Sequence, residues 1–134
     1  MTWMTWMARG KGLLLAAVGV GVGLNGVVGA FAPRRLQATY GIEVDDPDVA
    51  VLLHHRAVML AVIGSGLVAS ASRRELRSVA VSGAALSMAT YVLFALTAEV
   101  DEQQHRIAVA DVGLLLLLAA AVLTPERRES VRRA

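Results

Sequence analysis

Four long apolar blocks constrain the fold of this chain more than any other feature of its sequence. Each is close to the roughly 20 residues that a helix needs to cross the hydrocarbon core of a bilayer. They make 56% of the 134 residues hydrophobic and raise the mean hydropathy to +0.58. Apolar and polar residues do not alternate within them, which argues against the strands of a membrane barrel. We therefore expect residues 1–134 to form one all-α membrane domain, an antiparallel bundle of four transmembrane helices.

Local signals predict where these helices begin and end. Asp46 followed by Pro47 has the pattern of an N-cap with proline at the first helical position, and Asp101 is expected to cap the last helix. Residues 33–48 are expected to form the longest loop, and the polar tail from Pro125 is expected to fray. The predicted helices cover residues 10–32, 47–72, 77–98 and 102–124.

The first block has a second interpretation, because basic residues precede it and the sequence Ala-Phe-Ala ends it, as in a cleaved signal peptide. The block is longer than the apolar region of most signal peptides, and Pro33 would directly follow the cleaved bond. We therefore expect it to be retained as a helix. Trp3 and Trp6, beside Arg9 and Lys11, are typical of an anchor at the membrane interface.

Basic residues also predict the orientation in the membrane. Two precede the first block, three lie near the junction of the second and third helices, and four lie in the tail. Cytoplasmic segments are enriched in Lys and Arg, so we expect a plasma-membrane protein with both termini in the cytoplasm. The net charge is only +2, so nucleic acid is not an expected partner. The absence of cysteine excludes disulfides and thiolate metal sites.

The first helix is rich in glycine, and pairs such as Gly19 and Gly23 let two membrane helices approach closely. Asn25 is the one polar residue inside this span, with Gly21 and Gly29 one turn to either side. We expect this face to press against another helix and to deliver the Asn25 amide to it. Small residues at helix interfaces also favour a homodimer, although they would equally serve packing within one bundle.

Arg56 lies inside the second apolar block, and a charge at the centre of a bilayer costs about 2.5–3.5 kcal/mol on insertion scales. It should therefore have a partner. Counted from Pro47 and from Glu102, Arg56 and Asp111 are each the tenth residue of their helices. Both should then lie roughly 10–14 Å below the outer surface. We predict a buried ion pair between them.

Other polar residues are expected at or above the same depth. His55 adjoins Arg56, and Gln104 shares a helix face with Asp111. Ionisable residues inside a membrane are candidates for a functional site. The predicted catalytic residues are Asp111, Arg56 and His55, and the predicted ligand-binding residues are Asn25, Tyr91, Thr90 and Gln104.

This polar layer predicts an integral membrane protein that binds or converts a lipophilic small molecule or lipid. Asp111 would act as general base or acid and Arg56 would bind an oxyanion, which suits isomerisation or the hydrolytic opening of an epoxide. Two alternatives stay open. The layer would also lock the helix register of a structural or accessory subunit, or the chain would be a small oligomeric transporter. No metal and no organic cofactor are expected, because neither metal-ligand spacing on one helix face nor a phosphate-loop motif is found.

The segment around Arg56, LHHRAVMLAVIGSGLVASA, and the four-helix layout resemble the small DoxX-like integral membrane proteins of actinobacteria. Frequent alanine, valine and arginine suit a source of high GC content. The resemblance implies the four-helix membrane fold. It implies no role for individual residues, because the chemistry of that family is diverse.

Overall fold

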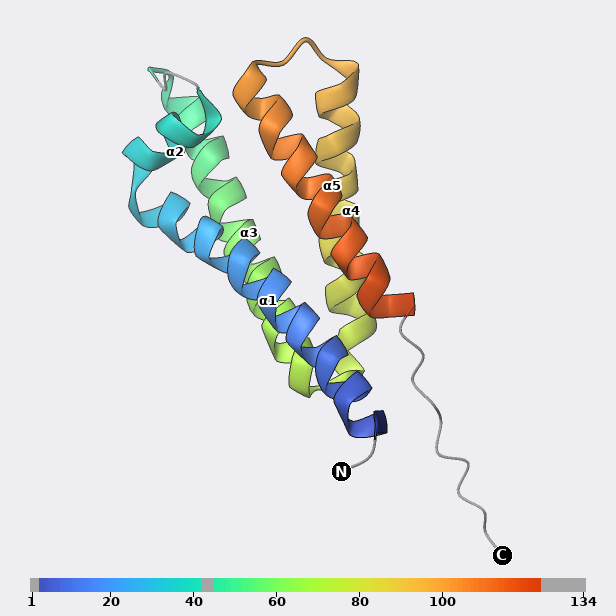
Figure 1. Ribbon diagram of the computed structural model, residues 1–134. Helices are drawn as coiled ribbons and strands as arrows, with labels where there is room; N and C mark the ends of the chain where they lie inside the picture. The colour runs from blue at the N-terminus through green and yellow to red at the C-terminus, as the bar shows by residue number, and fades with distance from the viewer. Residues whose placement is uncertain (1–2, 42–44, 124–134) are drawn as a thin grey trace, which may run out of the picture.

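The computed structural model describes residues 3–41 and 45–123. Throughout this described part the regular secondary structure is helical, and four of the five helices are long and apolar enough to cross a membrane. This confirms the predicted all-α fold with four membrane helices (Figure 1). The helices are α1 (Trp3–Phe31), α2 (Pro33–Tyr40), α3 (Pro47–Ser72), α4 (Arg74–Thr97) and α5 (Glu102–Leu123).

The start of α3 follows the predicted capping pattern. The backbone N–H of Asp48 donates to Oδ1 of Asp46 at 2.8 Å, and Pro47 occupies the first turn. The start of α4 differs from the prediction, because α4 begins at Arg74 and a single residue, Arg73, separates it from α3. The junction is therefore a sharp break between two helices rather than a loop, and it leads the chain back antiparallel to α3 (Figure 1).

The prediction of a loop over residues 33–48 is wrong in its first half, which forms α2. Pro33 begins this helix, where its fixed φ suits the first turn and its missing N–H costs nothing. Gly41 ends it with a φ of 67°, a left-handed conformation that favours glycine. Once its amide is oriented to suit its neighbours, Gln103 of α5 donates to the carbonyls of Ala38 and Thr39 at 2.9 and 3.1 Å. These bonds hold α2 against the first turn of α5.

Helices α1 and α3 are the most closely packed pair of the bundle. A Cβ added to Gly19 would lie 2.8 Å from the carbonyl oxygen of Gly64, and one added to Gly26 would collide with the backbone nitrogen of Ala61. Gly23 also lies against Gly64, as the Gly19–Gly23 spacing predicts. The expectation that Gly21 would press against a neighbouring helix is wrong, because a Cβ there would meet nothing within 4 Å.

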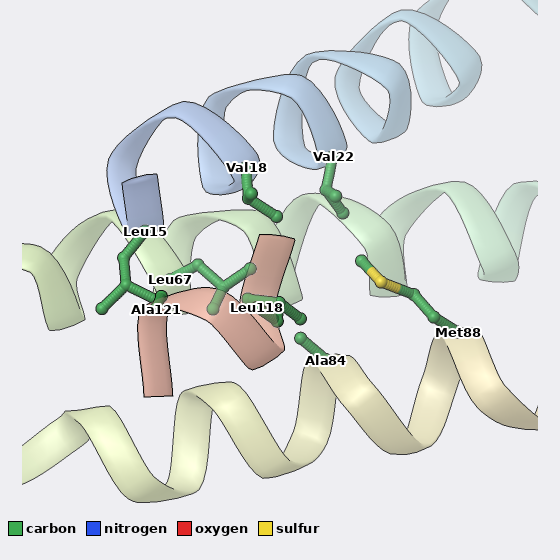
Figure 2. Packing of buried hydrophobic residues seen from close by; sticks show 8 residues of the cluster. All are labelled: Leu15, Val18, Val22, Leu67, Ala84, Met88, Leu118 and Ala121. Carbon is green, nitrogen blue, oxygen red and sulfur yellow. The ribbon is translucent and has the colours of Figure 1, made fainter. Parts of the chain in front are cut away.

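The apolar core occupies the half of the bundle near the start of α1 and the α3–α4 junction. Figure 2 shows its side chains converging from four helices. Leu15, Leu67 and Leu118 fill the centre, with alanines between them, and are at most 2% exposed. Large apolar side chains elsewhere point outward, as expected for a chain surrounded by lipid. The core cluster consists of Leu15, Val18, Val22, Leu67, Ala84, Met88, Leu118 and Ala121. The tail from Pro125, for which fraying is predicted, lies outside the described residues.

Candidate functional site

Polar side chains from four helices gather in the half of the bundle beyond this core. Each helix supplies one of them: Tyr40 ends α2, Arg56 lies in α3, Tyr91 in α4 and Asp111 in α5. We call these four residues the Arg56 site. Met88, one turn before Tyr91 on α4, belongs to the core cluster. The site therefore begins directly where the apolar packing ends.

Arg56 is the centre of this arrangement and is held by two tyrosines. Its Nε donates to the hydroxyl oxygen of Tyr40 at 3.1 Å. Its Cζ lies 4.1 Å from the ring centroid of Tyr91 and 5.5 Å from that of Tyr40. Both distances are within cation–π range, and such contacts strengthen where water is excluded. The guanidinium thus has partners in α2 and α4, while the remaining N–H groups make no described hydrogen bond.

Tyr40 is a site residue that our reading of the sequence missed, because it assigned residue 40 to a loop. The side chain is only 5% exposed, and its position follows from α2, which ends at Gly41 and is held by Gln103. A signal was present in the sequence. Leu36 and Tyr40 are four residues apart among polar neighbours, the spacing of one apolar helix face.

Tyr91 carries the most unusual polar atom of the site. Its hydroxyl group is buried and is the one buried side-chain oxygen or nitrogen of the described residues without a hydrogen-bond partner. Leaving such a group unpaired costs about 1–3 kcal/mol. The cation–π contact with Arg56 holds the Tyr91 ring in place. The position of the hydroxyl is therefore fixed, although it makes no described hydrogen bond.

Asp111 is half-buried on α5, and its charge interacts with both Arg56 and Tyr91. The predicted ion pair with Arg56 is wrong, because among the described residues no salt bridge within 4.0 Å joins the two side chains. The physical reason is the packing of the helices: α3 and α5 have little direct contact, whereas α4 packs against both. The Tyr91 ring of α4 therefore occupies a face of the guanidinium.

The other predicted site residues are not brought into this cluster by any described contact. Asn25 is exposed on the outer side of α1, so its expected delivery to a neighbouring helix is not seen within this chain. Thr90 is exposed and donates to the carbonyls of Leu86 and Ser87 on its own helix, at 2.8 and 3.0 Å. Consecutive residues differ by about 100° around a helix, so Tyr91 can face the site only if Thr90 turns away.

His55 and Gln104 are also outside the described contacts of the site. His55 is exposed, and its neighbour His54 is half-buried with Nδ1 3.0 Å from the carbonyl oxygen of Ala50. His55 therefore makes no described contact with Arg56. Gln104 is half-buried and makes no described side-chain hydrogen bond. The neighbouring Gln103 instead is the residue that contacts α2.

The surroundings of the site are sparsely charged. Arg106 and Glu102 form an exposed ion pair of 2.7 Å on α5, a kind of contact that contributes little to stability. No group of three or more His, Asp or Glu side chains placed to hold a metal ion occurs in the described ranges. Two surface cavities, of about 390 and 360 Å³, are lined by other residues.

The site thus combines a fixed cation, an unpaired hydroxyl and a carboxylate next to the apolar core. These groups can hold an oxygen-bearing molecule by hydrogen bonds and can exchange a proton with it. Comparison of the chain with protein-family models gives no match, and neither does comparison with curated proteins or with solved structures.

Proposed function

We propose that this integral membrane protein binds a lipophilic small molecule whose polar, oxygen-bearing end lies in the Arg56 site. The observation that carries the proposal is the buried Tyr91 hydroxyl, which has no partner among the described residues. It lies next to a guanidinium that uses only its Nε in a described hydrogen bond. A ligand oxygen between the two groups would pair both of them and remove the cost of the unpaired hydroxyl.

The structural alternative, a polar lock between helices, explains less of the geometry. The contacts of Arg56 with Tyr40 and Tyr91 join α2, α3 and α4, which is what a lock requires. A lock gains nothing, however, from an unpaired tyrosine hydroxyl, since phenylalanine would offer the same ring to the guanidinium. It also gains little from a carboxylate that makes no salt bridge with Arg56.

The membrane setting favours a ligand that is mostly apolar. Large hydrophobic side chains cover the outside of the four long helices, so the surroundings of the site are lipid-like. α3 and α5, which carry Arg56 and Asp111, have little direct contact. The side chains between these helices therefore have more freedom to make room than those of the tightly packed α1–α3 pair. We infer that the ligand enters from the lipid.

The same groups would support proton transfer on a bound carbonyl compound. The Asp111 carboxylate would accept a proton from the carbon next to the carbonyl group. The electron pair of that C–H bond would form a carbon–carbon double bond to the carbonyl carbon, and the π pair of the C=O bond would move onto the oxygen. There the N–H groups of Arg56 would stabilise the negative charge. If the compound carries a carbon–carbon double bond beside the deprotonated carbon, returning the proton to the far end of that double bond would shift it into conjugation with the carbonyl group. This isomerisation consumes no co-reactant.

Extraction of bound lipophiles tests the proposal. The full chain is purified in mild detergent, extracted with organic solvent, and the extract is analysed by mass spectrometry. We expect a compound that accompanies the wild type and is depleted at least about tenfold from Tyr91→Phe and Asp111→Asn. Leaving a buried polar group of the ligand without its partner costs about 1–3 kcal/mol, and about 1.4 kcal/mol is a factor of ten.

Thr90→Val is the matched control, because it removes a hydroxyl from the adjacent residue that already bonds to its own helix. It should retain the compound. An extract identical for all variants, or one with no enriched compound, would contradict the proposed binding function. Incubating an enriched compound with the protein in deuterated water then tests the proton transfer: wild type should incorporate deuterium and Asp111→Asn should not.

A further inference from the structure

A second polar region lies around the α3–α4 junction. Figure 1 shows this junction at the opposite end of the bundle from α2 and the α4–α5 connection. This polar region is the cavity of about 390 Å³, lined by residues from α1, α4 and α5. Its size lies within the roughly 300–1,000 Å³ typical of small-molecule sites. Its polar wall consists of Lys11, Arg74, Arg77, Ser78 and Ser82. We call this cavity the basic pocket.

All the ionisable side chains that line the basic pocket are positively charged. Three of its lining residues are Lys or Arg, and no acidic side chain of the described residues lines it. Arg77 is half-buried and oriented by α3, since its Nε and one Nη donate to the carbonyls of Ser70 and Ala71 at 3.3 and 3.4 Å. Arg74 is exposed at the rim. The pocket therefore combines a cation oriented by α3, Arg77, with an exposed cation at the rim, Arg74.

Two hydroxyl groups add hydrogen-bond donors to this positive wall. Ser78 and Ser82 are one turn apart on α4 and make no described side-chain hydrogen bond. Some other exposed hydroxyls bond within their own helices instead: Ser65 donates to the carbonyl of Ala61 and Thr97 to that of Leu93. The first turn of α4 also lacks a side-chain cap at Arg73, which leaves positively polarised N–H groups at this end.

The remaining wall is apolar and sits at a membrane boundary. Leu15, Val81 and Val122 line it, and the candidate spans of α1 and α4 begin close by, at Gly10 and Arg74. Cations, hydroxyls and an apolar side at the end of membrane helices match an anionic group carried on a lipophilic body. Basic pockets between membrane helices are suited to phosphate-bearing lipid headgroups.

We propose that the basic pocket binds a phosphate group at the membrane interface, with Arg74, Arg77, Ser78 and Ser82 as its ligands. Arg binds phosphate oxygens through two parallel N–H bonds, which gives both strength and orientation. The site is independent of the proposed ligand of the Arg56 site, because the apolar core lies between them.

Thermal unfolding of the full chain in detergent tests this inference. One arm adds phosphatidylglycerol to the micelles, with phosphatidylcholine as the neutral comparison. The other arm adds inorganic phosphate, with sodium chloride at equal ionic strength. We expect a saturable rise in melting temperature in at least one arm. A rise with phosphatidylglycerol alone assigns the phosphate to a lipid headgroup, and a rise with inorganic phosphate assigns it to a free anion.

Arg74→Gln should weaken the apparent affinity about tenfold, and the double variant Ser78→Ala/Ser82→Ala should weaken it as well. Arg73→Gln is the matched control, since this neighbouring residue is exposed, carries the same charge and does not line the pocket. Equal weakening by Arg73→Gln and Arg74→Gln would mean that only the general positive charge matters. That result, or no stabilisation in either arm, would overturn the inference.

Discussion

The two tyrosines of the Arg56 site have the same ring and opposite hydrogen-bonding states. Tyr40 accepts a hydrogen bond from Arg56, whereas the buried hydroxyl of Tyr91 has no partner in the described part of the chain. Removing each hydroxyl should therefore have different effects on the stability of the unliganded protein. Both rings lie near the charge of Arg56. The two hydroxyls therefore differ in hydrogen bonding because each oxygen has a different position relative to the guanidinium.

Tyr40→Phe should lower the free energy of unfolding by about 1.5–3 kcal/mol, the contribution of a hydrogen bond to a charged group. Tyr91→Phe should leave it unchanged or raise it by up to about 1–3 kcal/mol, because an unpaired buried hydroxyl is removed. Unfolding of lipid-depleted protein in detergent measures both. A clear loss of stability in Tyr91→Phe would indicate that the hydroxyl has a structural partner, and would favour the lock over the ligand site.

Arg56→Lys keeps the charge at the same position but removes the planar group that the two tyrosines hold. An ammonium group cannot reproduce the bond from Nε together with flat stacking on Tyr91. We expect a loss of about 1–2 kcal/mol from one hydrogen bond and a weakened cation–π contact. Amide hydrogen exchange should show faster exchange in α2, which Tyr40 links to α3. Unchanged protection of α2 would mean that Gln103 alone holds this helix.

At the scale of the helices, the distance between α1 and α3 is limited by direct contact between their backbones at glycine residues. A Cβ on Gly64 would collide with the backbone nitrogen of Gly23. Gly64→Ala should therefore force the helices apart and cost about 1–3 kcal/mol, as overpacking does. Gly83→Ala is the control, because a Cβ there meets nothing within 4 Å. Unfolding of both variants followed by circular dichroism measures the difference, and equal stabilities would contradict this packing.

The whole molecule is divided into two ends with different chemistry. The start of α1, the α3–α4 junction, the apolar core and the basic pocket belong to one end. The helix α2, the α4–α5 connection and the Arg56 site belong to the other (Figure 1). The basic residues at the first end are the basis for expecting it in the cytoplasm.

Single cysteines test this orientation cleanly, since the chain contains none. Ser72→Cys lies at the α3–α4 junction and Glu99→Cys in the α4–α5 connection, and both positions are exposed. A membrane-impermeant maleimide added to intact cells should label Glu99→Cys, while Ser72→Cys should react only after lysis. The reverse pattern would place the Arg56 site on the cytoplasmic side.

The sequence by itself determined the four long apolar helices, although not the short helix α2, because their signals are local. Block length predicts the membrane spans, Asp46 and Pro47 predict the start of α3, and the Gly19–Gly23 spacing predicts a close helix contact. The same reasoning found Arg56, Tyr91 and Asp111, since a polar residue in an apolar span is conspicuous at any helix rotation. Hydropathy alone, however, fixes neither the rotation of each helix nor which helices touch.

Tertiary structure decided which polar groups meet. Asn25 and Tyr91 are both polar residues inside apolar spans, yet only Tyr91 faces Arg56, because α1 presents Gly19, Gly23 and Gly26 to α3 and leaves Asn25 outside. Tyr40 enters the site through α2 and its contact with Gln103, which joins residues distant in the chain. Asp111 makes no salt bridge with Arg56 because α3 and α5 have little direct contact, whereas α4 packs against both. Depth along a helix follows from counting residues, whereas partnership depends on how the helices rotate and pack.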